Sequence, residues 1–172
     1  MLEQQPNTLG TLYIVSAASG TGKTTLVKKL LENMSEVRLS VSFTTRKMRD
    51  GEQDGVHYFF ITTDVFQEMV AHNAFYEYAH VHGNYYGTSR AWVDAQLRSG
   101  VDVVLEIDWQ GAAQMRQQWP HCRSIFVLPP DMAILEQRLR GRGTDSADVI
   151  ERRLAAAKTE IAQCTEYDYI VV

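Results

Sequence analysis

The sequence contains few of the features that mark disulfide-rich, membrane-bound or secreted proteins. Its two cysteines, Cys122 and Cys164, are too few to staple a chain of 172 residues and lack metal-ligand spacing. No apolar run approaches the roughly 20 residues that a membrane helix needs. Residues 1–10 are polar and have neither the basic start nor the apolar run of a secretory signal. We therefore expect a cytoplasmic protein with reduced thiols and no membrane partner.

Positive charge is also scarce. The chain has 17 Lys and Arg residues against 21 Asp and Glu, which gives a formal net charge of −4. Proteins that bind polynucleotides usually gather an excess of Lys and Arg on one face to contact the phosphate backbone. We therefore expect no nucleic-acid partner, whereas a small anionic ligand needs only a few local cations.

The residues that are present suit one globular domain of the α/β class. Apolar residues make up 45% of the chain and charged residues 22%, close to the averages for soluble proteins. The apolar and glycine patterns predict strands that alternate with helices. The expected strands are 11–16, 101–107, 123–128 and 169–172, and the clearest expected helices are 24–33 and 109–118. This alternation predicts a mostly parallel sheet with helices on both faces.

One stretch of the chain, residues 38–88, departs from this alternation. It has short aromatic strands, expected at 58–61 and 75–81, which are separated by turn-rich segments. Thr88 and Ser89 can then cap a new helix. We expect a single domain over 1–172, with a core formed by 11–37 and 89–172 and a small mixed β lobe inserted at 38–88.

A phosphate-binding loop is expected at 16–25, where the sequence is SAASGTGKTT. It matches the P-loop pattern except that Ala17 stands in place of the first glycine. Gly20 and Gly22 let the backbone curl so that N–H groups point at phosphate oxygens, Lys23 would reach the β and γ phosphates, and the Thr24 hydroxyl would bind Mg²⁺. The expected nucleotide-binding residues are Ala17, Ala18, Ser19, Gly20, Thr21, Gly22, Lys23, Thr24 and Thr25.

An ordinary turn before a helix is the alternative for this segment. The buried strand before it and the amphipathic helix after it favour the phosphate loop. The loop alone does not name the acceptor of the phosphate, because kinases, GTPases and motor ATPases share it.

Further motifs indicate which molecule accepts the phosphate. They are SFTTRKMR at 42–49, GE at 51–52, HYFF at 57–60, Glu77, GNYYGTS at 83–89 and DWQG at 108–111. In this order and spacing, from residue 12 to 172, the series resembles the guanylate kinase family. The resemblance implies a P-loop NTPase-type fold and phosphate transfer from ATP to GMP, with Mg²⁺ as cofactor. It also implies a continuation past Val172, with a loop near the adenine and a final helix. A chain without them is expected to expose apolar surface and lose stability or affinity for ATP.

The resemblance assigns the GMP phosphate to residues that can each donate a hydrogen bond: Ser42, Arg46, Arg49, Tyr58 and Tyr86. Two arginine forks suit a phosphate dianion, and hydroxyl groups complete the oxygen shell without adding charge. A solvated basic turn beside core aromatic residues is the alternative interpretation.

The resemblance assigns the guanine base to Glu77, Thr88 and Asp108. A carboxylate can accept hydrogen bonds from guanine N1–H and from its 2-amino group, and adenine offers neither donor. The alternative for Glu77 is a surface carboxylate on a lobe strand.

Glu106 lies two residues before Asp108 at a strand end, where P-loop proteins keep a metal-binding acid. The family more often has Asp at this position, so the metal geometry stays open, as does the choice between Glu106 and Asp108.

The segment from about 138 to 153 resembles the family's lid over the ATP phosphates. By that resemblance Arg138, Arg142 and Arg153 close over the reacting group, where cations stabilise spreading charge. A solvated arginine-rich helix is the alternative. With Lys23 and Arg46, these arginines complete the expected catalytic set.

Two other functions are compatible with parts of the pattern. Some guanylate-kinase-like domains bind phosphopeptides without catalysis, but they usually lack a working phosphate loop. A kinase of another small phosphorylated acceptor would share the loop, but it would not need the base-reading carboxylates. The sequence leaves open the preference between GMP and dGMP, the kinetics and regulation, and whether the protein forms homo-oligomers.

Overall fold

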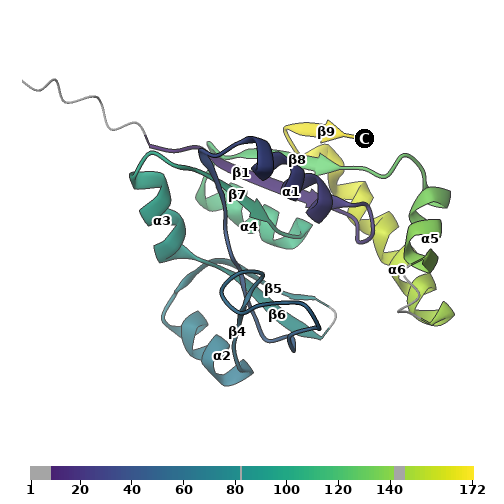
Figure 1. The fold of residues 1–172 in the computed structure, drawn as a ribbon, viewed down its shortest axis with the longest axis horizontal. Helices are drawn as coiled ribbons and strands as arrows, with labels where there is room; N and C mark the ends of the chain where they lie inside the picture. Colours follow the sequence, from purple (N-terminus) through teal and green to yellow (C-terminus); the bar gives the residue numbers. More distant parts are fainter. Residues whose placement is uncertain (1–8, 82, 142–145) are drawn as a thin grey trace, which may run out of the picture.

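The structure is a computed structural model that describes residues 9–81, 83–141 and 146–172 (Figure 1). Its larger sheet contains five strands in the order β2-β7-β1-β8-β9, and every neighbouring pair is parallel. The strands are β1 (Leu12–Ala17), β2 (Val37–Leu39), β7 (Asp102–Glu106), β8 (Arg123–Val127) and β9 (Tyr169–Val171). The predicted parallel α/β sheet is therefore confirmed.

Helices cover both faces of this sheet, as the alternation predicted. Side chains along β1 alternate, so Ile14 points to one face and Val15 to the other. The face of Ile14 packs against α3 (Arg90–Arg98) and α4 (Trp109–Gln118), whereas the face of Val15 packs against α1 (Lys23–Asn33). The ends of β1 and β7 meet between these layers, because Val15 pairs with Glu106.

A separate mixed sheet lies beside α3 and α4 (Figure 1). Its order is β4-β3-β6-β5, with β3 and β4 parallel and the other pairs antiparallel. The strands are β3 (Phe43–Thr44), β4 (Phe59–Phe60), β5 (Phe75–Val81) and β6 (Asn84–Ser89). The predicted mixed β lobe is present, and β5 has the predicted bounds.

Three strands, β2, β3 and β6, and one helix were not predicted. Helix α2 (Thr63–Ala71) lies inside the lobe, where the Thr62 hydroxyl caps it by accepting from the Val65 N–H. Its Phe66 is buried and stacks on Phe75, with ring centroids 4.6 Å apart. The short strand β2 pairs with β7, so the larger sheet continues to residue 39, past the expected core boundary at 37.

The C-terminal part consists of α5 (Met132–Gly141), α6 (Ala147–Ala162), a 3₁₀ turn (Gln163–Glu166) and β9. Leu135 and Leu139 of α5 pack with Ile150 and Ala157 of α6 and with Ala18 of the phosphate loop. The segment expected to form the lid therefore lies against that loop, although residues 142–145 fall outside the described part. None of the helices that the structure describes is both long and apolar enough to cross a membrane.

Candidate functional site

The phosphate loop joins β1 to α1 and has the backbone that its glycines allow. Gly20 and Gly22 have φ angles of 92° and 108°, which residues with a side chain rarely adopt. The Thr21 N–H donates to the Ala18 oxygen at 3.1 Å and closes the turn. Gly22 then caps α1, so the positive end of that helix faces the loop. This arrangement is a ready site for phosphate groups.

Lys23, the first residue of α1, reaches across to the end of β7. Its Nζ donates to the Ile107 oxygen at 3.2 Å, and that oxygen also accepts from the buried Ser16 hydroxyl at 2.9 Å. Burial lowers the pKa of the Lys23 ammonium, and the carboxylates of Glu106 and Asp108 oppose this shift. Lys23 is thus a partly buried cation at the point where the two strands end.

Thr24 and Glu106 form a second link across the same strand ends. The Thr24 hydroxyl donates to Glu106 Oε1 at 2.5 Å. A hydroxyl oxygen and a carboxylate oxygen are hard donors of the kind that Mg²⁺ prefers, and Mg²⁺ sites often take only one or two protein ligands besides substrate phosphates. The residues present therefore fit Mg²⁺.

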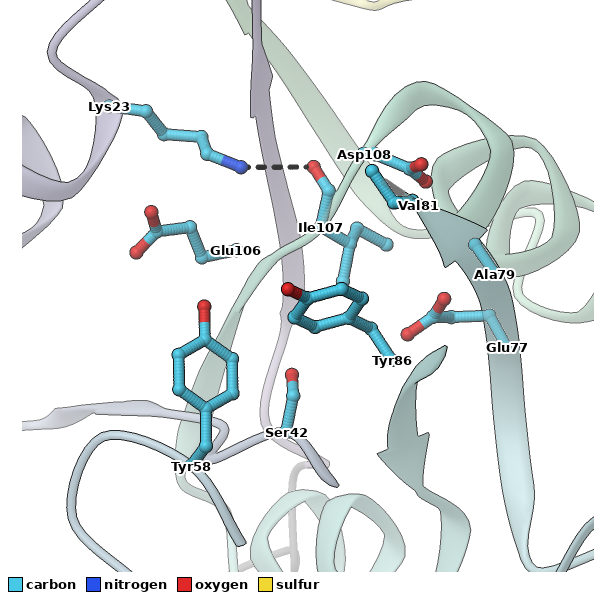
Figure 2. A pocket seen from close by; sticks show the side chains of 10 residues that line it. All are labelled: Lys23, Ser42, Tyr58, Glu77, Ala79, Val81, Tyr86, Glu106, Ile107 and Asp108. Carbon is cyan, nitrogen blue, oxygen red and sulfur yellow. Dashed lines mark hydrogen bonds between the residues drawn. The ribbon is translucent and has the colours of Figure 1, made fainter. Parts of the chain in front are cut away.

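A cavity opens between this edge of the larger sheet and the lobe (Figure 2). It brings together seven of the residues singled out from the sequence, which come from both sheets and from the segments beside them. Its lining residues are Lys23, Ser42, Tyr58, Glu77, Ala79, Val81, Tyr86, Glu106, Ile107 and Asp108. Ala79 and Val81, which the sequence did not single out, follow Glu77 at alternate positions of β5 and so give its wall an apolar surface.

Glu77 is the most deeply buried carboxylate of the cavity, with 3% of its surface exposed. Its Oε1 accepts a hydrogen bond of 2.5 Å from the buried Thr88 hydroxyl on β6. Burial raises the pKa of Glu77 to about 7, although the Thr88 hydrogen bond and the charge of Lys23 lower it. Thr88 thus contacts Glu77 and does not itself line the cavity.

The Asp108 carboxylate belongs both to the cavity and to the start of α4. It lines the cavity, and its Oδ1 caps α4 by accepting from the Gly111 N–H at 2.8 Å. The capping bond orients the carboxylate, because the helix holds the Gly111 N–H in place. The Gln110 side chain also donates to Oδ2, at 3.4 Å.

Arg46 does not line the cavity but lies beside Tyr58, which does. Its guanidinium makes a two-bond contact with Glu52, at 2.7 and 3.0 Å, and lies 5.4 Å from the centre of the Tyr58 ring. The hydrogen bonds to Glu52 raise the pKa of Arg46. Glu52 follows Gly51 in the motif series, but no role was predicted for it. Arg49 is exposed, and its backbone N–H also donates to Glu52, at 2.8 Å.

Two of the predicted lid arginines, Arg138 and Arg153, border different hollows. Arg138 Nη1 donates to the Thr21 oxygen at 2.5 Å and lines a hollow beside Gly20, Gly22 and Thr25. Arg153 borders a different surface hollow, with Val149, Arg152 and Ala156. Arg142 lies outside the described residues.

Glu160 on α6 contacts the phosphate loop, which the sequence did not reveal. Its carboxylate accepts from the Ser19 N–H at 3.1 Å, across 141 positions of the chain. A single acid on a long helix carries no signal of such a contact.

Comparisons with known proteins agree with these observations. A family model described as guanylate kinase matches residues 9–172. The chain is 54% identical over 165 residues to the guanylate kinases of Vibrio parahaemolyticus serotype O3:K6 and Escherichia coli strain K12, which covers 95% of this chain and 80% of each relative. The crystal structure of guanylate kinase from Anaplasma phagocytophilum is similar at a TM-score of 0.77 and 34% identity, over 96% of this chain and 77% of that one.

Proposed function

The chain belongs to the guanylate kinase family and is an ATP:GMP phosphotransferase, and we propose that its cavity binds GMP while the adjacent phosphate loop binds ATP. In this proposal the lobe at 38–88 holds GMP, the core at 11–37 and 89–172 holds ATP, and the segment at about 138–153 acts as the lid. The reaction would take place in the cytoplasm.

The buried carboxylate of Glu77 carries the assignment of GMP to this cavity. In its ionised form it would accept hydrogen bonds from guanine N1–H and from the 2-amino group. AMP offers neither of these donors, so the buried carboxylate would keep only its bond to Thr88, and sites of this kind discriminate by roughly 10⁴-fold or more. Thr88 and Asp108 would complete the base site, Thr88 through its hydrogen bond to Glu77.

The GMP phosphate would lie between the base site and the phosphate loop, near Ser42, Tyr58 and Tyr86. Burial raises the pKa of Tyr58, which keeps its hydroxyl protonated as a hydrogen-bond donor. Arg46 and Arg49 would supply the charge. The salt bridge to Glu52 already orients Arg46. Both side chains are largely buried, with exposed fractions of 12% for Arg46 and 17% for Glu52.

The transfer step needs no nucleophile from the protein. A phosphate oxygen of GMP attacks the γ-phosphorus of ATP in line, the bond to the β,γ-bridging oxygen breaks, and ADP and GDP form. Lys23 would stabilise the charge on the transferring group, and Arg138, Arg142 and Arg153 would close over it. Thr24 and Glu106 would hold Mg²⁺, directly or through water, and when bound it would neutralise charge on the ATP phosphates.

Nucleotide turnover with a panel of acceptors tests this function. The protein is given ATP and Mg²⁺ with GMP, AMP, CMP or UMP, and ADP release is followed in a coupled assay. We expect turnover with GMP and none above background with the others. Turnover with a different acceptor would reject the base assignment, and binding of GMP without turnover would reject the catalytic one.

A further inference from the structure

Helix α4 covers an edge of the lobe sheet. Strand β5 lies at the end of that sheet, with β6 on one side only, so its other side offers backbone groups that need partners. The Gln114 side chain on α4 supplies two of them. Its Oε1 accepts from the Tyr78 N–H at 3.2 Å, and its Nε2 donates to the Tyr78 oxygen at 2.9 Å. This pair of bonds imitates a neighbouring strand and fixes β5 against the helix.

A second glutamine repeats the contact one turn later. Gln118 Nε2 donates to the Tyr76 oxygen, and Gln118 Oε1 accepts from Arg90 Nη2 at 3.0 Å. Arg90 also donates to the Phe75 oxygen at 3.1 Å. The backbone of β5 is therefore held on both sides of Glu77, at Tyr76 and at Tyr78.

The third contact on this face of α4 is made by a residue without a side chain. A methyl group at Gly111 would overlap Glu77 Oε2, and it would lie 3.0 Å from Glu77 Cδ. Because Oε1 is taken by the Thr88 hydroxyl, the carboxylate lies between Thr88 and the bare Cα of Gly111. Gly111 has no positive φ angle, so its own backbone does not require glycine.

Residues 111, 114 and 118 are three and four positions apart, which places them on one face of the helix. All three contact β5 within one residue of Glu77 or at Glu77 itself. The same helix begins at Asp108, whose carboxylate is oriented by the Gly111 N–H. One rigid element thus sets the position of both carboxylates of the base site.

We propose that this face of α4, formed by Gly111, Gln114 and Gln118, positions Glu77 for guanine recognition and that Gly111 is a determinant of nucleotide specificity. The proposal rests on the proposed binding of GMP at Glu77. Neither the glutamines nor Gly111 needs to touch the nucleotide, so they are positioning residues. Their loss should affect GMP and leave ATP binding unchanged.

The substitution Gly111→Ala tests the close contact. Alanine is the better helix former, so α4 itself should not suffer. The added methyl group should displace the Glu77 carboxylate, and misplacement by about 1 Å can cost on the order of 100-fold. We expect kcat/KM for GMP to fall by that order while the KM for ATP stays within about twofold. An unchanged kcat/KM for GMP would overturn the proposal.

A double-mutant cycle separates this effect from a general loss of structure. In a Glu77→Ala background the methyl group has no carboxylate to displace, so Gly111→Ala should change kcat/KM for GMP by less than about twofold. An equal loss in both backgrounds would show that Gly111 acts independently of Glu77 and would contradict the proposal.

Gln114→Met keeps the length of the side chain and removes both hydrogen bonds to Tyr78. We expect a higher KM for GMP, an unchanged KM for ATP and weaker discrimination between GMP and AMP. The matched control is Gln117→Met, at an exposed residue of the same helix, and it should leave all three values unchanged. Equal effects of the two variants, or a normal KM for GMP in Gln114→Met, would contradict the proposal. These variants also keep the proposal testable if Gly111→Ala fails to fold.

The wild-type protein distinguishes failure of this proposal from failure of the proposed function. A wild-type chain that does not use GMP rejects the function itself. A wild-type chain that uses GMP, together with normal Gly111→Ala and Gln114→Met variants, rejects only the role of α4.

Discussion

The Thr88 hydroxyl donates to Glu77 Oε1 at 2.5 Å, and this bond crosses from β6 to β5 inside the wall of the cavity. It leaves the carboxylate with one partner in a place where only 3% of the residue is exposed. Burial outweighs the hydrogen bond, and the pKa of Glu77 is raised to about 7. A group in this state responds to pH near neutrality and to any ligand that offers it hydrogen-bond donors.

The first prediction concerns activity and pH. Only ionised Glu77 can accept from both guanine donors, so kcat/KM for GMP should rise with pH through about 7. Ionisation of one group with this pKa makes the value about tenfold lower at pH 6 than at pH 8. Glu77→Gln should lack the contribution of this ionisation. Any pH dependence of kcat/KM that remains in that variant comes from ionisation of the GMP phosphate. Identical pH profiles for the two proteins would contradict the role of Glu77.

The second prediction concerns stability and pH. Folding raises the pKa of Glu77 from 4.5 to about 7, so the folded state holds its proton more tightly than the unfolded state. The stabilisation from this group is complete below pH 4.5 and is lost as the pH rises through 7, by about 3 kcal/mol. We expect the difference in free energy of unfolding between wild type and Glu77→Gln to change by this order between pH 4.5 and 8. Urea titrations at several pH values measure it, and parallel curves would rule out the shift.

Removal of the phosphate-loop lysine should remove most of the turnover without unfolding the protein. Lys23→Ala takes away a cation next to the transferring group, and such losses cost about 10² to 10³ in kcat. Burial already disfavours the charge of Lys23, so the melting temperature should change little. Lys28→Ala, on the exposed side of the same helix, is the matched control and should keep full activity. Near-normal turnover in Lys23→Ala would reject the mechanism.

The contact between Thr24 and Glu106 predicts how the enzyme responds to Mg²⁺. Glu106→Gln keeps a hydrogen-bond acceptor for the Thr24 hydroxyl but removes the negative charge. We expect the Mg²⁺ concentration at half-maximal activity to rise by about 10- to 100-fold. Glu106→Asp should lie between this variant and wild type, because it restores the charge on a shorter side chain. An unchanged Mg²⁺ titration in Glu106→Gln would exclude Glu106 from the metal site.

The sequence predicted those elements whose signals are local. Strand Phe75–Val81 and helix Trp109–Gln118 have the predicted bounds, because apolar patterning and turn residues mark both ends. Helix α2 was missed because it is short and lies in a turn-rich lobe, where its cap at Thr62 and its buried Phe66 are weak signals alone. Strand β2 was missed because three residues show no periodicity and gain their partner only in the sheet.

The candidate site could be predicted only where a local motif marks its residues. The phosphate loop and the carboxylates of Glu77, Glu106 and Asp108 follow from motifs, and the structure brings these carboxylates and Lys23 around one cavity. The contacts that orient them join residues far apart in the chain, such as Glu160 with Ser19 and Gln114 with Tyr78. Such contacts depend on how the elements pack, and no local pattern reports them.

The most direct test of guanine recognition by Glu77 compares GMP, inosine monophosphate and AMP as acceptors in wild type and in Glu77→Ala. Inosine monophosphate keeps the N1 proton and lacks the 2-amino group, so it offers the carboxylate one donor instead of two. We predict that kcat/KM in wild type falls in the order GMP, inosine monophosphate, AMP, and that these differences largely disappear in Glu77→Ala. Equal kcat/KM values for the three acceptors in wild type, or selectivity that survives in Glu77→Ala, would contradict the account.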